Sequence, residues 1–480
     1  MKAKAPRLSL LFRVAVMVLS CGLATGATAQ TFTTLLDLST PNATGPSGAL
    51  IQSINGNYYG ASAGGGASER GTVFEVTPSG GLTDVYGFCA LLDCADGAQP
   101  YSALVLGADL NLYGVTSAWG NPNWGTVFRM TLTGKLTTLY TFCSAPNCTD
   151  GKIPNGLIRA SNGNLYGTTQ FGGTNGLGAF FEVTSTGEYR VLYNFCSQPN
   201  CADGVAPQVP PIQGVNGNLY GTTFTGGLND GGVLYEISPS GSYKVFYNFC
   251  APPDCADGAV PNGLVQDAGG NFYGTTSGGV LNVSAYGTVF KISPRHQLTV
   301  LHTFELVDGA YPFTAVALAN DGNLYGTTSQ GDNGALQGAG NIFQVTPNGD
   351  FTVLHSFCTG SNCSEVFPNA LFQGTDGVLY GTASGGGTFD GGTVFSLSNN
   401  LSPLVETLPE AGSVGARVII LGNNLKGSSI VTFNGVAAAF TVESDTYITA
   451  TVPGGATTGT VSVVTPMGTL NSNPQFVVSK

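Results

Sequence analysis

Charged and catalytic side chains are scarce in this chain of 480 residues. Only 9% of the residues are charged, and there are three histidines, His296, His302 and His355. No G-x-S-x-G, H-E-x-x-H or P-loop pattern occurs, so we predict no catalytic residues from motifs. Paired carboxylates for glycoside chemistry stay open, because a folded ring brings distant residues together.

Long apolar runs are absent after the N-terminus. Lys2, Lys4, Arg7 and Arg13 precede an apolar stretch at 14–23, and Ala27-Thr28-Ala29 follows. This order predicts a cleaved signal peptide over 1–29 and a secreted or extracytoplasmic protein without an integral membrane segment. Cys21 is a less favoured alternative, as the acceptor of a lipoprotein anchor.

Basic clusters are also missing. Four of the 16 basic residues lie in the signal, so 12 remain against 28 acidic residues, a net charge of about −16. Such a surface argues against nucleic acid and anionic membranes as partners. No metal or cofactor is predicted.

What the chain does contain is a repeat. The tetrad Asn-Leu-Tyr-Gly or a close variant occurs seven times, at steps of 52 to 55 residues, with its tyrosines at Tyr59, Tyr113, Tyr166, Tyr220, Tyr273, Tyr325 and Tyr380. Each period holds four short apolar runs bounded by Gly, Asn, Asp or Ser, which is typical of strands. Asn-Gly and Asp-Gly pairs, such as Asn55-Gly56, predict tight hairpin turns.

The two ends of the repeat region indicate how it closes. A lone strand at 32–38 precedes the first period, and the last period stops after its third strand, at 393–398. The early strand can complete the last sheet, whereas an open solenoid leaves two exposed edges. We therefore predict a seven-bladed β-propeller over 30–400. The connections from outer to inner strand and from second to third strand are expected on one face.

Ten cysteines form five pairs, each directly after an outer strand. They are Cys89/Cys94, Cys143/Cys148, Cys196/Cys201, Cys250/Cys255 and Cys358/Cys363. In an exported chain such pairs predict five local disulfides, with a metal site as the minor alternative. An Asp-Gly follows most pairs, and we interpret its carboxylate as a cap on local backbone amides rather than a calcium ligand.

The unit GTVFxxTPxGxxTVLYxF…DGAxPxxxLxxxxDGNLYGTTxxGG resembles the GloVer tandem repeat of exported bacterial proteins over about 31–400. The resemblance implies a secreted propeller-like protein and brings no catalytic residues. Residues 401–480 lack the repeat. Segments such as VIILGNNL and VTFNGVAA resemble an IPT/TIG immunoglobulin-like domain, which implies a small β-sandwich and names no ligand.

Aromatic residues in the loops between second and third strands are the candidate recognition site. They are Trp119, Trp124, Phe171, Phe224, Tyr286 and Phe389. Flat rings on polar loops can stack on sugars, although they can also simply cover blade edges. We expect a non-enzymatic binding protein for glycan or protein at the bacterial surface. The alternatives are a polysaccharide-degrading enzyme with channel carboxylates and a purely structural envelope protein.

Overall fold

The computed structural model describes residues 30–120, 124–278, 286–331, 339–359, 362–363 and 365–479. The predicted signal peptide and Cys21 lie outside these residues. The described part is built of strands and turns, with three short 3-10 segments: η1 (Leu92–Cys94), η2 (Pro146–Cys148) and η3 (Pro199–Cys201). Among the described residues, none of the helical segments is long and apolar enough to span a bilayer.

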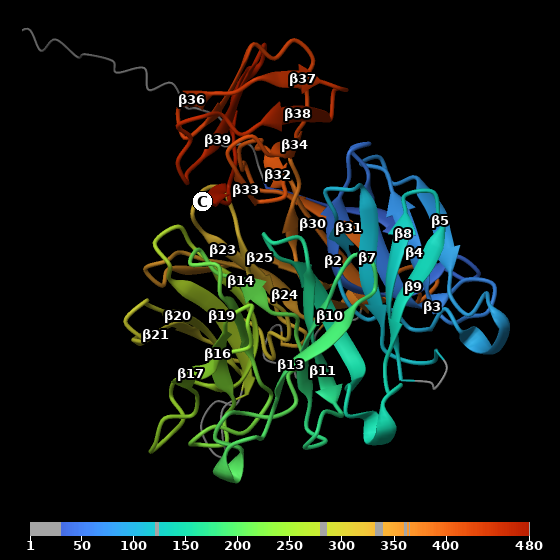
Figure 1. Ribbon diagram of the computed structural model, residues 1–480, viewed down its shortest axis with the longest axis vertical. Coiled ribbons are helices and arrows are strands. Elements are labelled where there is room, and N and C mark those ends of the chain that lie inside the picture. Colours follow the sequence, from blue (N-terminus) through green and yellow to red (C-terminus); the bar gives the residue numbers. More distant parts are fainter. Residues whose placement is uncertain are drawn as a thin grey trace, which may run out of the picture.

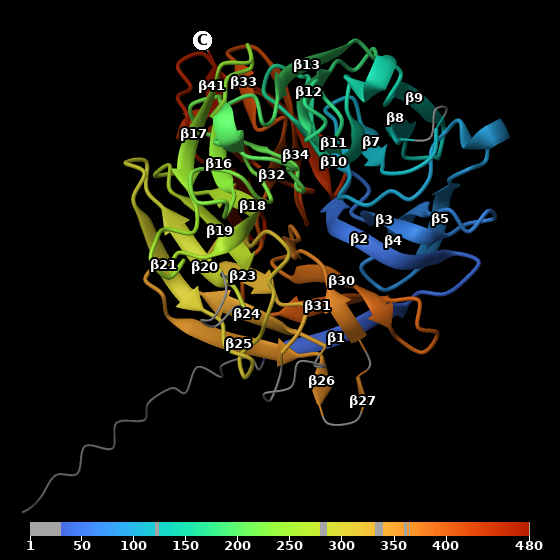
Figure 2. The same cartoon turned by 90° about the horizontal axis from the view of Figure 1, so that it is seen from below.

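Seven antiparallel sheets surround a common axis as a propeller-like ring (Figure 2). Within the first six sheets, which we call blades one to six, the spatial order of the strands follows the chain. The first three blades contain β2 (Ala43–Gln52), β3 (Tyr58–Gly65), β4 (Thr72–Val76) and β5 (Leu82–Gly87); β6 (Val105–Leu106), β7 (Asn111–Thr116), β8 (Thr126–Thr131) and β9 (Leu136–Thr141); and β10 (Lys152–Arg159), β11 (Leu165–Phe171), β12 (Ala179–Val183) and β13 (Tyr189–Asn194).

Blades four to six repeat the pattern, and blade seven draws on both ends of the ring. Blades four to six contain β14 (Ile212–Gln213), β15 (Leu219–Thr222), β16 (Val233–Ile237) and β17 (Tyr243–Asn248); β18 (Ala259–Gln266), β19 (Phe272–Gly278), β20 (Thr288–Ile292) and β21 (Leu298–Thr303); and β22 (Ala317–Leu318), β23 (Leu324–Thr327), β24 (Asn341–Val345) and β25 (Phe351–Ser356). Blade seven contains β28 (Glu365–Pro368), β29 (Phe372–Gln373), β30 (Leu379–Gly386), β31 (Thr393–Ser398) and β1 (Thr31–Asp37), and the ribbon β26 (Cys358–Thr359) with β27 (Asn362–Cys363) precedes it.

The predicted closure of the ring is confirmed. Strand β1 pairs antiparallel with β31, and Phe32 lies opposite Leu397 in this ladder. At the inner side of the same junction, the Asn369 side-chain amide donates to the carbonyl of Pro46 at 2.8 Å. The N-terminal strand therefore supplies the outer strand of blade seven and leaves no open sheet edge at this junction.

The repeated tetrad has a packing reason. In six of the seven blades its tyrosine hydroxyl hydrogen-bonds the turn residue four positions earlier, as when Tyr113 donates to Asp109 at 2.7 Å. Tyr273 donates to Asp267, six positions earlier. Its glycine lies under a third-strand aromatic ring, and a Cβ atom at Gly114 would be 2.5 Å from the ring of Phe128. Because that space is filled, a side chain at this position would force the two strands apart.

The C-terminal segment forms an immunoglobulin-like sandwich. One sheet holds β32 (Glu406–Leu408), β34 (Arg417–Leu421), β38 (Tyr447–Thr451) and β37 (Phe440–Val442); the other holds β36 (Val436–Ala437), β35 (Ile430–Phe433), β39 (Val461–Thr465) and β40 (Gly468–Asn471); and β33 (Ala411–Ser413) pairs with β41 (Val477–Ser479). Its core is separate from the ring and includes Ile420, Phe433 and Phe476.

The sandwich sits on one end of the ring (Figure 1). Ile419 and Leu421 of β34 join a buried apolar cluster that includes Tyr59 and Leu106 of the first two blades. On the far side of the axis, the Asn473 amide donates to the carbonyl of Leu318 at 2.6 Å. The sandwich thus contacts blades on both sides of the central axis and covers the mouth of the ring.

Candidate functional site

The two faces of the ring differ. The long connections, from outer to inner strand and from second to third strand, lie on the face opposite the sandwich. In blades two to four, the loop after the second strand contacts the cysteine-bearing loop that enters the same blade. The amide of Gly120, for example, donates to the carbonyl of Cys94 at 3.1 Å, and Gly173 and Gly227 make the equivalent bonds to Cys148 and Cys201. The prediction that both kinds of connection open on one face is confirmed. We call this surface the loop face.

Local disulfides close the cysteine loops. The bonds join Cys89 to Cys94, Cys143 to Cys148, Cys196 to Cys201, and Cys250 to Cys255. These four predicted pairings are confirmed. For the fifth pair the backbone places Cys358 opposite Cys363 in the β26–β27 ladder, while their side chains lie outside the described part, so that bridge stays a prediction.

The aspartate after each disulfide organises its own loop. Asp203 is fully buried, and its carboxylate accepts hydrogen bonds from the Tyr193 hydroxyl at 2.6 Å, the Ser197 amide at 2.8 Å and the Gln198 amide at 3.2 Å. Asp96, Asp150 and Asp257 accept equivalent bonds. The carboxylates therefore act as loop caps. Among the described residues, no group of three or more His, Cys, Asp or Glu side chains could hold a metal ion.

Blade six shows that the aspartate cap does not need a disulfide. Asp308 accepts the amide of Glu305 at 2.8 Å and lies 3.0 Å from Nε2 of His302. The His302 ring stacks on Phe351 at 3.7 Å, as Tyr193 stacks on Tyr243 in an earlier blade. His302 therefore takes the place of the usual tyrosine, and His355 stacks on Phe32 in the same way.

Left-handed backbone connects neighbouring blades at the loop face. The residue before the inner-strand proline has a positive φ in all seven blades: Gly45, Gln99, Ile153, Ala206, Val260, Tyr311 and Phe367. In six of them its amide binds a carbonyl of the preceding blade, as when Gln99 donates to Arg70 at 2.7 Å and Gly45 to Gly391 at 2.8 Å. Six of the seven residues are not glycine, so this unfavourable conformation is held by the contact between blades.

The six predicted aromatic residues lie in or beside the second loops, but they do not form one cluster. Trp119 and Trp124 bridge each other through their backbones, with Arg70 over the first ring at 4.8 Å and Lys152 over the second at 4.6 Å. Trp124 is 38% exposed and Trp119 is half-buried. Phe224 and Phe389 are exposed, and Phe171 and Tyr286 are half-buried.

Exposed apolar side chains gather on the loop face well beyond these aromatics. The large ones are Leu91, Leu92, Tyr101, Trp124, Phe224, Leu228, Val307, Phe313, Phe367 and Phe389. In the rest of the described ring, only Val215 and Val353 are comparable. Leu92 is 86% exposed and Leu228 is 76% exposed. The aliphatic members were not predicted, although their positions in the cysteine and glycine-rich loops are visible in the sequence.

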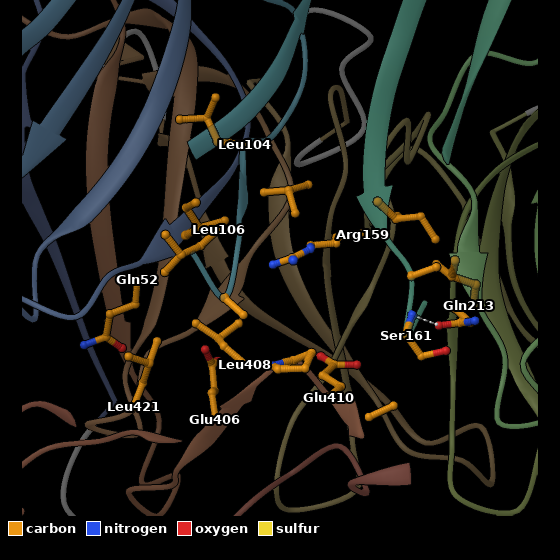
Figure 3. Close-up of a pocket in the computed structure, with 18 of the residues that line it drawn as sticks. Gln52, Leu104, Leu106, Arg159, Ser161, Gln213, Glu406, Leu408, Glu410 and Leu421 are labelled. Atoms are coloured by element: carbon orange, nitrogen blue, oxygen red, sulfur yellow. Dashed lines mark hydrogen bonds between the residues drawn. The ribbon is translucent and has the colours of Figure 1, made fainter. Parts of the chain in front are cut away.

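A cavity that we did not predict lies at the opposite face, under the sandwich. It has a volume of about 370 Å³, and its walls come from the ends of the inner strands of blades one to four and from β29. Glu406 and Leu408 of β32, together with Glu410, form its floor, and Arg159 points into it from β10 (Figure 3). We call this cavity the capped mouth.

The carboxylates of the capped mouth have shifted proton affinities. Glu406 is partly accessible through the cavity, yet protein surrounds it, and this burial together with the nearby Glu410 raises its pKa to about 8. Glu410 is an exposed residue at the edge of the cavity, and the protein around its carboxyl group raises its pKa. Asp109 lies outside this cavity. Burial raises its pKa, but hydrogen bonds from Asn111 and Tyr113 and the charge of Arg159 outweigh that effect, so its pKa is lowered.

Fold and loops define a repeat β-propeller protein with an immunoglobulin-like cap. The repeat region matches the Gloeobacter/Verrucomicrobia repeat over residues 23–158 and 153–395, and residues 404–478 match the IPT/TIG domain. The chain belongs to the Gloeobacter/Verrucomicrobia repeat family. Both predicted resemblances are confirmed. No curated protein sequence matches the chain.

Solved structures match the chain at low sequence identity. One is described as the extracellular domain of a hybrid two-component system from Bacteroides thetaiotaomicron, with 13% identity, a TM-score of 0.50, and coverage of 91% of this chain and 53% of that chain. Another is PorZ, a surface component of the type-IX secretion system of Porphyromonas gingivalis, with 14% identity, a TM-score of 0.44, and coverage of 89% and 59%. The chain thus spans about half the length of the first of these proteins.

Proposed function

We propose that this chain is an exported, non-enzymatic binding protein of the bacterial cell surface, and that its loop face docks a protein partner. The supporting observation is the gathering of exposed apolar side chains on that face. Exposed apolar surface of this kind marks interaction sites more often than ordinary surface. Leu91, Leu92 and Leu228 are aliphatic, and such side chains suit the apolar centre of a protein interface better than the flat face of a sugar.

Two further features support export to the cell surface. Four disulfides persist in an oxidising compartment and are rare in the cytosol. The predicted signal over 1–29 gives a route to that compartment. The sandwich covers the other end of the ring, whereas no other domain in the described part of the chain covers the loop face.

The test is a triple variant, Leu92→Ser, Leu228→Ser and Phe389→Ser, in the intact protein. Photo-crosslinking to envelope proteins of the producing cells, followed by affinity measurement with the captured partner, should show binding at least tenfold weaker for the variant. The matched control is Val353→Ser, an exposed apolar residue on an outer strand. Equal binding by the triple variant and the parent would refute the loop face as the docking surface.

Glycan binding is the second candidate, and the tryptophan pair favours it. Trp119 and Trp124 lie side by side with a cation over each ring, and a ring fixed in this way is a stacking platform for a sugar. Replacing both with Ala should remove most binding on a glycan array and leave the melting temperature nearly unchanged. A large drop in melting temperature would instead show that the rings are packing residues.

The enzymatic alternative concerns carboxylates in the channel. Turnover of a polysaccharide panel by the parent, lost in Glu406→Gln, would establish it in place of pure binding.

A further inference from the structure

The capped mouth has a neighbouring cavity, and the linings of the two together include residues of all seven blades. A second cavity of about 370 Å³ adjoins the first, and both are lined by Ile212, Gln213, Glu410 and Ala411. The second is walled by the inner-strand ends of blades five and six and by the 473–475 turn of the sandwich. Each space is partly open and of a size that holds a small organic molecule.

The repeat departs from its own pattern around this space. In four blades the inner strand ends in glutamine, namely Gln52, Gln213, Gln266 and Gln373, and its side-chain oxygen accepts a backbone amide from the preceding blade. The equivalent residues of blades two, three and six are Leu106, Arg159 and Leu318, as their register opposite the second strand shows. Leu106 and Arg159 line the capped mouth, and Leu318 lines the adjoining cavity.

Two acidic side chains without partners among the described residues line this space. Neither the Glu406 nor the Glu410 side chain forms a hydrogen bond or ion pair within the part of the chain that the structure describes. Arg159 does not compensate them, because its charge acts on Asp109 and its Nη1 has no hydrogen-bond partner. Ionisation of Glu406 in this largely apolar surrounding is costly, and a cation bound beside it can offset that cost.

We propose that the capped mouth binds a small organic amine, with its ammonium group on Glu406 and Glu410 and its carbon chain along Leu106, Leu408 and Ile212. Carboxylates select a cation, and the apolar wall selects an organic cation over a metal ion, which would need six or more oxygen ligands. This proposal concerns a different face from the docking surface proposed above and stands independently of it.

Binding of an amine at this site should also depend on pH, because it is linked to release of a proton. The titratable or charged groups around Glu406 are Glu410 on its own segment, Tyr58 of blade one and Arg159 of blade three. Because the pKa of Glu406 is about 8 in the free protein, an ammonium ion bound beside it lowers that pKa and drives release of a proton at pH 7. Binding should therefore strengthen from pH 5 to pH 8.

The experiment is calorimetric titration of the full chain with 1,5-diaminopentane. We expect one molecule bound per chain, a heat that depends on the ionisation enthalpy of the buffer, and binding at least tenfold weaker at pH 5 than at pH 8. The double variant Glu406→Gln/Glu410→Gln should bind at least tenfold more weakly than the parent. The neutral probe 1,5-pentanediol should not bind.

Two matched variants make the outcome decisive. Glu188→Gln removes the same kind of charge from an exposed turn and should bind like the parent. Arg159→Gln removes a positive charge from the cavity and restores the glutamine of the repeat, so it should bind the diamine several-fold more tightly. Weaker binding in Arg159→Gln, or equal binding of the diol, would overturn the proposal. If the double variant fails to fold, Arg159→Gln and the pH series decide alone.

Discussion

The two faces of the ring differ in the kind of connection that forms them. On the loop face, long connections carry the disulfides, the buried aspartates and the exposed apolar side chains. On the capped face, the turns are only a few residues long. Four inner-strand glutamines, which we call the glutamine belt (Gln52, Gln213, Gln266 and Gln373), bind the preceding blade. The C-terminal domain covers the opening of the ring on this face. The same repeat can therefore form two kinds of surface. The connections on the loop face can vary in length, whereas the turns on the capped face are kept short by the geometry of tight hairpins.

The largest expected difference between the faces comes from the buried aspartates. Asp203→Ala removes an acceptor from one hydroxyl and two amides of the cysteine loop. Donors left without a partner should destabilise the protein by about 3 kcal/mol. The drop in melting temperature is the measurement, and Asp254→Ala, at an exposed position of the cysteine loop that enters blade five, is the control. Similar melting of both variants would contradict the capping role.

Disulfides should contribute less than the aspartates. Cys196→Ser/Cys201→Ser opens a five-residue separation, and the chain-entropy estimate gives about 2 kcal/mol. The melting temperature of the variant should be lower than that of the parent in oxidising buffer, and the two melting temperatures should become equal after reduction. Peptide mapping without reductant should also join Cys358 to Cys363. A bridge from Cys94 to Cys143 would contradict local pairing altogether.

On the capped face, the glutamine belt should contribute about 1 kcal/mol per residue. Gln213→Leu removes an acceptor from the Ser161 amide, 2.8 Å away, and a donor to the Gly217 carbonyl, 3.0 Å away. The chain already carries leucine at the equivalent Leu106 and Leu318, so the fold should be retained. Gln297→Leu, in an exposed turn, is the control. A variant as stable as the parent would show that the belt is not needed.

The last expected effect is confined to high pH and comes from Glu406. Its pKa is raised from 4.5 to about 8 in the folded state, so between these values the folded state binds more protons than the unfolded state. Stability from this group is therefore full below pH 4.5 and is lost as pH rises to about 8. Glu406→Gln should melt above the parent at pH 9 and closer to it at pH 5. An unchanged pH profile would contradict the shifted pKa.

Most of the ring was predictable because each unit repeats the same local physics. The tetrad fixes a turn, a buried tyrosine and a glycine under an aromatic ring, and the missing outer strand of blade seven predicts its closure by β1. The capped mouth was not predictable in the same way, since Glu406 and Glu410 lie in a segment without a motif and enter the cavity only when the sandwich docks. A signal did exist: Arg159 stands where the repeat prefers glutamine.

Closure of the ring through β1 also sets an order of events in folding. The strand that completes blade seven is among the first synthesised, but its partner β31 begins at Thr393. Blades one to six can form from neighbouring segments, whereas this last pairing joins the two ends of the ring and carries the largest loop-closure entropy. We expect a late intermediate in which β1 and β31 are unpaired, and such edges attract other chains. Chaperone demand during export should therefore depend on how fast the ring closes.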